Sequence, residues 1–446
     1  MDGYHEDTYA IGLASIVGVA VQKGWEARVA IVKNESEYKD VLRKIQEFQP
    51  QIVGFSSVSS QFVYVKRIAE LIKQDYPAAT IICGGVHPTI SPYSIKDAPG
   101  IDVFFVGESE VAFGEFLDRV QQGEDYHVCD NCAYVKDGEV VINRLKPLLK
   151  DLDSLPFPDK DVYPYNESVA HHGIAPFMFS RGCPYQCTYC SNHAIASVYG
   201  KTRNEPRFRS VDLCMKEMEM VIEKYHPEKI YIMDDIFGLN KKWRHEFCEQ
   251  YQKRIRLPFI CILRVEVVSE EFIKELKESG CIRVQFGVES GSEYVRKKLM
   301  NRHMTNEQII KAFKLCQKYG LETNAINLIG IPGETEPMIW ETINLNRTLK
   351  PTSSGVNIFY PYKGTVLGDQ CFRDDLVDLA KYNDSLRERR ESVIKYPEEY
   401  HKKLRYYYDN WDVLVNPFDI RARIKRILDK IGLLETARSI RDRLAK

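Results

Sequence analysis

Short apolar runs alternate with amphipathic helical stretches along most of this 446-residue chain. In the first third, the runs that predict buried strands lie at residues 27–32, 51–57, 80–83 and 103–106. Helical patterns lie at residues 9–23, at about 35–48 and in the stretch that ends at Pro77. Parallel strands need a crossover helix between them, so this alternation predicts a parallel, doubly wound α/β sheet over residues 1–150.

Small residues follow two of the predicted strands at the edge where such sheets bind ligands. Ser56 and Ser57 end one strand, and Gly84, Gly85 and His87 follow the next. Ligands of open α/β sheets lie in the crevice beyond the carboxyl ends of the strands, and glycine allows the backbone to approach them closely. Loops of this kind also favour glycine for turning, so a ligand site and a plain turn both fit the pattern.

A second series of strand and helix patterns follows a break in the chain. Leu155-Pro156-Phe157-Pro158 marks a domain boundary, within a linker expected at residues 151–174. Beyond it, strands are predicted at residues 175–180, 229–234, 259–263, 281–286, 322–329 and 354–359. Helical patterns separate these runs, which indicates six βα units over residues 175–366. Residues 367–446 are expected to form a helical C-terminal region.

Charge and apolar run length exclude two broad classes of protein. The chain has 62 Lys and Arg against 63 Asp and Glu, so its net charge of −1 does not predict a nucleic-acid partner. The longest apolar run, residues 10–21, is shorter than the roughly 20 residues of a membrane span. Acidic residues precede this run where a signal peptide would be basic, so we expect a cytoplasmic protein.

Twelve cysteines need an explanation, because disulfides are rare in the cytoplasm. Seven lie singly among apolar residues and are expected to be small buried side chains: Cys83, Cys214, Cys248, Cys261, Cys281, Cys316 and Cys371. Cys129 and Cys132 form a lone Cys-x2-Cys pair beside a hairpin predicted at residues 132–143. An exposed hairpin or a redox-sensitive dithiol is expected there rather than a second metal cluster.

The remaining three cysteines carry the strongest chemical signal. Cys183, Cys187 and Cys190 follow the strand predicted at residues 175–180 with the spacing Cys-x3-Cys-x2-Cys. Three thiolates on one loop suit an iron–sulfur cluster, and three ligands leave one iron of a [4Fe–4S] cube open. His193 lies nearby, but its spacing is not usual for zinc. The alternative is a non-catalytic binding or regulatory protein in which the cysteines hold a structural ion.

This motif, with Tyr189 just before the third cysteine, resembles the signature of radical S-adenosylmethionine (SAM) proteins. Together with Gly-Gly-x-His-Pro at 84–88, Gly-Glu-x-Glu at 107–110 and Leu-Asp-Ser-Leu-Pro-Phe-Pro at 152–158, the chain resembles the branch with a B12-binding domain. That branch includes anaerobic magnesium-protoporphyrin ester cyclases, hopanoid enzymes and methyltransferases. The resemblance implies a six-stranded partial (β/α)6 barrel, an oxygen-sensitive [4Fe–4S] cluster, SAM, and a methyltransferase or cyclase reaction.

The resemblance also assigns candidate SAM contacts at the strand ends of the barrel. They are Asp234 for the amino group, Arg264 for the carboxylate, Glu289 and Ser290 for the ribose and methionine parts, and Gly330 and Pro332 for the adenine. Each has a structural alternative. Asp234 fits a helix N-cap, Arg264 fits a salt bridge with Glu266, and Glu289 fits another salt bridge. Asp235 stays unassigned, and no catalytic residue is predicted.

Cobalamin is the third cofactor that the resemblance implies. Its expected contacts are Ser56, Ser57, Gly84, Gly85 and His87, but the Asp-x-His-x-x-Gly motif that supplies a cobalt ligand elsewhere is absent. Only residues 1–8 precede the first predicted helix, whereas members of the branch begin with a strand. We therefore expect either that Met1 is not the natural start, or that the domain has lost its cofactor and has an unpaired sheet edge.

The partners follow from the chemistry and from the end of the chain. A radical SAM enzyme needs an electron donor such as a flavodoxin or ferredoxin, while the small-molecule or lipid-like substrate is not identified by any residue. From Pro417 on, apolar and basic residues alternate at helical spacing. This basic amphipathic helix fits docking on its own domain or contact with an anionic membrane surface.

Overall fold

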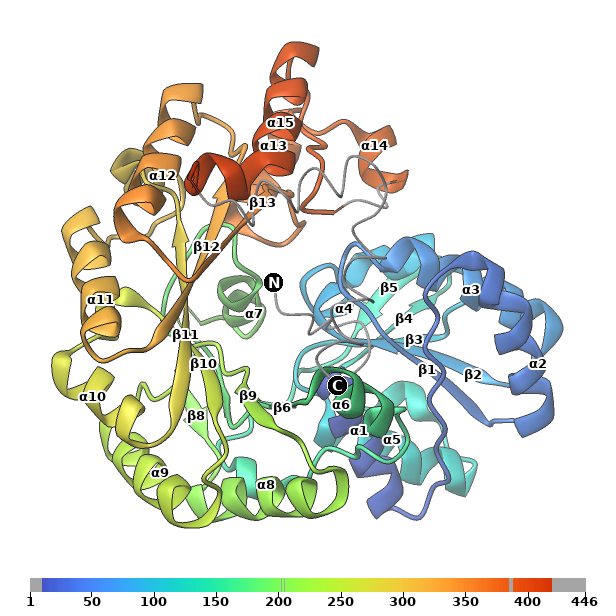
Figure 1. Cartoon of the computed structure of the whole chain (residues 1–446). Coiled ribbons are helices and arrows are strands. Elements are labelled where there is room, and N and C mark those ends of the chain that lie inside the picture. Colours follow the sequence, from blue (N-terminus) through green and yellow to red (C-terminus); the bar gives the residue numbers. More distant parts are fainter. Residues whose placement is uncertain (1–9, 202, 204, 385–387, 419–446) are drawn as a thin grey trace. The chain divides into compact units, whose positions relative to one another are not determined.

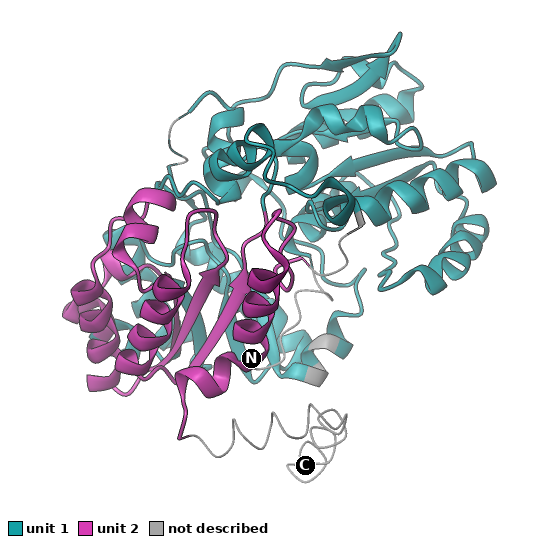
Figure 2. Ribbon diagram, turned by 90° about the horizontal axis from the view of Figure 1, so that it is seen from above, with its two compact units in different colours: residues 1–262, 274–282, 361–386 teal, residues 263–273, 283–360, 387–446 magenta. Residues whose placement is uncertain are grey.

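The computed structural model describes residues 10–418 except 202, 204 and 385–387. The chain divides into two compact units, residues 1–262, 274–282 and 361–386 in one and residues 263–273, 283–360 and 387–446 in the other (Figure 2). Each unit is described by itself. The basic helix predicted from Pro417 falls almost wholly outside the described residues.

A five-stranded sheet forms the first part of unit 1, in the order β1-β2-β3-β4-β5 (Figure 1). Its strands are β1 Ile52–Ser56, β2 Thr80–Gly84, β3 Val103–Phe105, β4 Cys132–Lys136 and β5 Glu139–Ile142. The helices around it are α1 Ile11–Gln22, α2 Tyr38–Phe48, α3 Phe62–Asp75, α4 Val86–Ile90 and α5 Glu110–Gln122. β1, β2 and β3 are parallel, and the predicted hairpin joins the sheet as antiparallel strands.

Helices cover both faces of this sheet, because alternate strand residues point to opposite sides. Ile81 and Phe104 pack into a core with α2 and α3. Ile82 and Phe105 pack into a second core with α1 and α5. Figure 1 shows these two helix pairs on opposite sides of the strands. The arrangement confirms the predicted α/β class with a doubly wound N-terminal sheet.

The strand predicted at residues 27–32 is wrong. These residues alternate between half-buried and exposed, as a strand would, but form no strand and make no ladder with β1. Periodicity reports which side of a segment meets apolar surface, whereas a strand also requires backbone hydrogen bonds to a neighbour. Among the described strands, β1 therefore ends this sheet.

The second sheet has six strands in the order β13-β12-β11-β10-β9-β6. They are β6 Ile174–Phe177, β9 Lys229–Ile232, β10 Phe259–Leu263, β11 Cys281–Glu289, β12 Glu322–Ile329 and β13 Ser353–Ile358. The pairs β6–β9, β9–β10, β11–β12 and β12–β13 are all parallel. All six strands predicted in this region are confirmed, and the order matches a partial (β/α)6 barrel.

The remaining elements connect or extend these strands. The helices are α6 Tyr165–His172, α7 Ser191–Val198, α8 Val211–Tyr225, α9 Lys241–Arg254, α10 Glu270–Glu278, α11 Asn306–Lys318, α12 Glu336–Leu349, α13 Val366–Arg373, α14 Leu379–Asp384 and α15 Glu398–Val415. Two short strands, β7 Ser180–Arg181 and β8 Arg207–Phe208, pair with each other. None of the described helices is long and apolar enough to cross a bilayer.

Candidate functional site

The three clustered cysteines lie on one loop between β7 and α7. Cys183 and Cys187 are buried and Cys190 is partly exposed. The pKa of the Cys190 thiol is raised to about 12, mainly by loss of solvent around the sulfur and in smaller part by the neighbouring Cys187, Asp235 and Cys183. The three thiols therefore lie within electrostatic range of one another, on a segment that starts at the end of the first barrel strands.

This donor set fits an iron–sulfur cluster. Among the described residues, no three His, Cys, Asp or Glu side chains converge as the ligands of one metal ion. The thiolates of an iron–sulfur cube each bind a different iron, so they do not need to converge on a point. Three cysteines on a short loop match that requirement in number and in chemistry.

An acidic pair that follows β9 holds the stem of the cysteine loop, residues 179–182. Asp234 is completely buried, and its Oδ1 accepts hydrogen bonds from the backbone N–H of Phe179 at 2.6 Å and of Ser180 at 3.1 Å. Its Oδ2 accepts a third from the Ser180 hydroxyl at 2.6 Å. Burial raises the pKa of Asp234 to about 6 although the three hydrogen bonds lower it. Asp234 thus ties β9 to the strand that leads into the loop.

Asp235, which the sequence left unassigned, contacts both ends of the same loop. Its Oδ1 accepts from the Asn192 side-chain amide at 2.8 Å, and the carboxylate also accepts from the backbone N–H of Gly182. Gly182 precedes the first cysteine and Asn192 follows the third. The Asp-Asp doublet was visible in the sequence, but its partners are brought to it only by the fold.

In unit 2, the predicted SAM residues Arg264 and Glu289 lie in ion pairs. Arg264 Nη2 contacts Glu266 Oε1 at 2.5 Å, which is the structural alternative that the sequence left open. Burial would raise the pKa of Glu266, but Arg264 and Arg302 lower it overall. Arg302 also lies 4.0 Å from Glu289 Oε1 and donates to the Gly287 carbonyl at 2.5 Å. Arg302 is a member of this cluster that the sequence did not indicate.

Ser290 is fully buried directly after β11. Its hydroxyl lies 3.2 Å from the Thr342 hydroxyl and accepts from the backbone N–H of Ser292 at 3.1 Å. Glu289 just before it has a φ of +65°, a conformation that costs a non-glycine residue free energy. The chain therefore turns sharply at the end of β11.

The segment after β12 is held by Tyr396 and by helix α15 of the same unit. Gly330 has a φ of +77°, and its N–H donates to Glu334 Oε2 at 2.6 Å. Burial raises the pKa of Glu334 to about 8. The Tyr396 hydroxyl donates to the Gly330 carbonyl, and the Tyr400 hydroxyl on α15 donates to the Glu334 carbonyl, each at 3.2 Å. Pro332 between these anchors stays partly exposed.

The predicted cobalamin residues lie together at the ends of β1 and β2. Ser56 and Gly85 are exposed, Gly84 is partly exposed and Ser57 is buried. A side chain at Gly85 would lie 2.8 Å from the backbone N and O of Ser57, and Gly85 has a φ of +103°, so only glycine fits there. The exposed part of this edge is lined by small residues and backbone, which suits a large ligand.

His87 belongs to the core of this domain and not to its edge. Its Nδ1 lies 3.2 Å from the Ser59 hydroxyl and its Nε2 lies 2.9 Å from the Ser94 hydroxyl, while its ring stacks on Phe62 at 3.9 Å. Burial, together with the smaller effect of the positive charges of Lys363 and Lys66, lowers the pKa of His87 to about 4. Both ring nitrogens are engaged, so His87 offers cobalt no free ligand atom.

The expectation for Cys129 and Cys132 is corrected. Both residues are buried, and they pack with Phe105 and Phe116 in the core beside α5. Burial raises the pKa of the Cys132 thiol well above its usual value. A buried protonated thiol reacts slowly, so this pair forms neither an exposed hairpin nor a reactive dithiol.

Comparison with known families agrees with both halves of this description. Residues 177–345 match the family model of the radical SAM superfamily, and residues 3–117 match that of the B12 binding domain. The chain therefore contains a B12-binding domain followed by a radical SAM domain. This is the combination that the sequence resemblance implied. The radical SAM family implies a [4Fe–4S] cluster and SAM as cofactors, and the non-catalytic alternative is not supported.

The relatives of this chain include a methyltransferase and a cyclase. The chain is 29% identical to an uncharacterized methyltransferase of Pyrococcus horikoshii, over 82% of this chain and 79% of that protein. It is 26% identical to the anaerobic magnesium-protoporphyrin IX monomethyl ester cyclase of Rubrivivax gelatinosus, over 80% of this chain and 64% of that protein. Among solved structures, the methyltransferase TsrM of Kitasatospora setae, with cobalamin and a [4Fe–4S] cluster bound, has a TM-score of 0.68 at 17% identity, covering 83% of this chain and 73% of that one. That likeness confirms the fold.

Proposed function

We propose that this chain is a cobalamin-dependent radical SAM enzyme that transfers a methyl group to, or closes a ring on, a small or lipid-like substrate. The observation that carries the proposal is one loop with three cysteines, between β7 and α7, in a chain that also matches the B12-binding domain. When bound, the [4Fe–4S] cluster supplies the electron for reductive cleavage of SAM, and cobalamin supplies a carrier for a one-carbon group. Cys183, Cys187 and Cys190 would hold the cluster.

The chain's own residues bind and orient SAM in this proposal. Arg264 would face the SAM carboxylate from its pair with Glu266, and Glu289 and Ser290 would meet the ribose and methionine parts at the sharp turn after β11. Gly330 and Pro332 would pack on the adenine. The anchoring of their segment by α15 supports this role, because a preorganised binding segment loses less entropy on binding.

For Asp234 we propose a role other than the contact with the SAM amino group that the sequence pattern predicted. The carboxylate is completely buried and accepts three hydrogen bonds from residues 179 and 180. SAM could reach it only if these bonds opened. Asp234 and Asp235 are therefore proposed to orient the cysteine loop through hydrogen bonds to the residues just before and just after it.

Cobalamin is proposed to lie at the edge formed by Ser56, Ser57, Gly84 and Gly85. The small, partly exposed residues there support this placement. His87 would stabilise the domain rather than ligate cobalt, because both of its nitrogens are bonded to serine hydroxyls. A low-potential donor such as a flavodoxin or ferredoxin would deliver the electron in the cytoplasm, where free thiols persist.

Anaerobic reconstitution with iron and sulfide tests the proposal. We expect about four irons per chain and release of 5′-deoxyadenosine or S-adenosylhomocysteine from SAM under reductant. Cys183→Ala, Cys187→Ala and Cys190→Ala should each abolish the cluster, because two protein ligands are too few to hold it. Cys129→Ala and Cys132→Ala are the matched controls and should keep their iron. Stoichiometric zinc without iron, and no cleavage of SAM, would refute the radical SAM assignment.

A separate measurement tests cobalamin. After incubation with hydroxocobalamin and desalting, about one corrinoid per chain should remain, detected by its visible absorbance. A bulky Gly84→Trp variant should lose it, whereas His87→Gln should retain it. Complete loss of colour from the unaltered chain, with SAM cleavage intact, would contradict the cobalamin claim and leave a radical SAM enzyme without it.

A further inference from the structure

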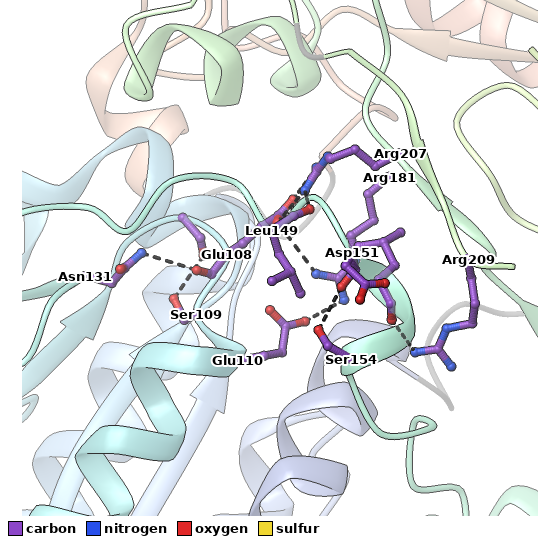
Figure 3. Close-up of polar contacts among 12 residues, drawn as sticks. Glu108, Ser109, Glu110, Asn131, Leu149, Asp151, Ser154, Arg181, Arg207 and Arg209 are labelled. Carbon is purple, nitrogen blue, oxygen red and sulfur yellow. Dashed lines mark hydrogen bonds and ion pairs between the residues drawn. The ribbon is translucent and has the colours of Figure 1, made fainter. Parts of the chain in front are cut away.

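A network of partly buried ion pairs joins the loop after β3, residues 107–110, to the chain that leads into the cysteine loop (Figure 3). Arg181 Nη2 donates to Glu110 Oε1 at 2.5 Å. The Arg207 guanidinium donates two hydrogen bonds to the Glu108 carboxylate, Nη2 to Oε1 at 2.5 Å and Nη1 to Oε2 at 2.8 Å. All four residues lie within unit 1. Two acidic residues of the B12-binding domain thus face two arginines of the radical SAM domain.

The two arginines mark the base of the cysteine loop. Arg181 is two residues before Cys183. It pairs with Arg207 in the antiparallel ladder between β7 and β8, so the backbones of the two arginines are joined. Arg207 also donates to the Leu149 carbonyl at 2.8 Å. Anything that fixes these arginines fixes the direction in which the chain enters the cysteine loop.

The same β3–α5 loop also contacts the far side of the cysteine loop. The backbone N–H of Glu108 donates to the hydroxyl of Tyr199, which caps the end of α7, the helix that follows Cys190. Gly107 has a φ of +81°, and a side chain there would lie 2.1 Å from that hydroxyl. Glycine is therefore required for this approach. The loop at 107–110 touches the cysteine segment both before its first cysteine and after its last.

Burial makes these contacts restrictive. The Glu110 and Arg207 side chains are 10% and 11% exposed, and their partners Arg181 and Glu108 are 23% and 18% exposed. Buried charges need their partners, and bidentate arginine–carboxylate pairs fix orientation as well as distance. Behind the loop, the Asn131 amide donates to the carbonyls of Val106 and Glu108 and holds the loop in place. The domain fold, and not a flexible tether, sets the position of the two carboxylates.

We propose that Glu108 and Glu110 are positioning residues for the cluster: the B12-binding domain orients the cysteine loop through Arg181 and Arg207. This inference rests on the proposed function and adds a role for the Gly-Glu-x-Glu segment that neither family model assigns. The consequence is that the N-terminal domain affects the environment of the cluster even when no cobalamin is bound.

Glu110→Gln tests the proposal, because it removes the charge and keeps the shape. Glu115→Gln is the matched control, since Glu115 lies on the same helix α5 and pairs with Lys146 at 2.9 Å within the B12-binding domain. The first measurement is hydrogen–deuterium exchange of residues 181–190 in the chain without cluster. We expect exchange about tenfold faster in Glu110→Gln and unchanged in Glu115→Gln.

The second measurement is the electron paramagnetic resonance spectrum of the reduced, reconstituted enzyme with and without SAM. We expect Glu110→Gln to change the spectrum and to weaken its response to SAM, and Arg181→Gln to have the same effect alone or combined with Glu110→Gln. Unchanged loop exchange in Glu110→Gln would overturn the proposal. Faster exchange with an unaltered spectrum would show that Glu110 stabilises the loop without affecting the cluster, and this result would also overturn the proposal. Failure of the unaltered chain to cleave SAM would instead refute the proposed function, because the exchange measurement needs no cluster.

Discussion

Replacing Asp234 by Asn separates a structural role of this carboxylate from a contact with SAM. An asparagine oxygen can still accept from the N–H groups of Phe179 and Ser180, and its amide can donate to the Ser180 hydroxyl. The substitution therefore keeps the connection between β9 and the stem of the cysteine loop. It removes only the charge.

The pH dependence of this variant can be worked out from the structure. Burial raises the pKa of Asp234 from 3.8 to about 6, which at about 1.4 kcal/mol per pKa unit corresponds to roughly 3 kcal/mol. Because the folded pKa is the higher one, this stabilisation is complete below about pH 4 and is lost as the pH rises through 6. Asp234→Asn should lack this loss, so its stability relative to the unaltered chain should rise by roughly 3 kcal/mol between pH 4 and pH 8. Asp234→Ala leaves three buried donors unpaired and should cost more than about 3 kcal/mol.

The assay is hydrogen exchange of residues 177–182 at pH 5.5, 7 and 8, because a chain of two compact units does not unfold in one step. Differences between variants at one pH remove the intrinsic effect of pH on exchange. SAM affinity, measured by equilibrium dialysis on the reconstituted enzyme, should change less than about threefold in Asp234→Asn. A loss of tenfold or more, with the protection of residues 177–182 intact, would refute the structural role and show that Asp234 contacts SAM.

Two further predictions concern His87 in unit 1 and the tyrosines Tyr396 and Tyr400 in unit 2. His87→Gln should make the stability of residues 86–91 less sensitive to acid. The folded pKa of His87, about 4, lies below the unfolded value of 6.5. The neutral ring therefore stabilises the fold above pH 6.5, and about 3 kcal/mol of this stabilisation is lost as the pH falls toward 4. Equal acid sensitivity in the variant, measured by hydrogen exchange at pH 5 and 7, would contradict this. Removing the hydroxyls of Tyr396 and Tyr400 by Phe should weaken SAM binding several-fold without loss of iron, because each hydrogen bond to the segment at Gly330 contributes about 1 kcal/mol. Tyr406→Phe, at an exposed position on α15, is the control. If it weakens SAM binding as much as the variant with both Tyr396→Phe and Tyr400→Phe, the two hydroxyls do not anchor the segment specifically.

Local pattern in the sequence was enough to determine the class of fold and the chemistry of the cluster. The six barrel strands follow from short apolar runs between helical stretches, and the Cys183, Cys187 and Cys190 spacing places three thiols on one loop whatever surrounds them. Both signals depend on residues close in sequence, and such signals survive in any context that folds. The failure at residues 27–32 marks the limit of this reasoning, because a strand exists only where a neighbour supplies backbone partners.

Tertiary structure alone decided which charged side chains meet. Arg264 found Glu266 two residues away, but Asp234 binds residues 54 and 55 positions earlier, and Arg181 binds Glu110 from another domain, 71 positions away. A charge buried without a partner costs so much free energy that each one must be paired, yet the sequence does not state with which. The partner is chosen by where the strands end in space, and this is why the acidic residues that orient the cysteine loop became visible only in the folded chain.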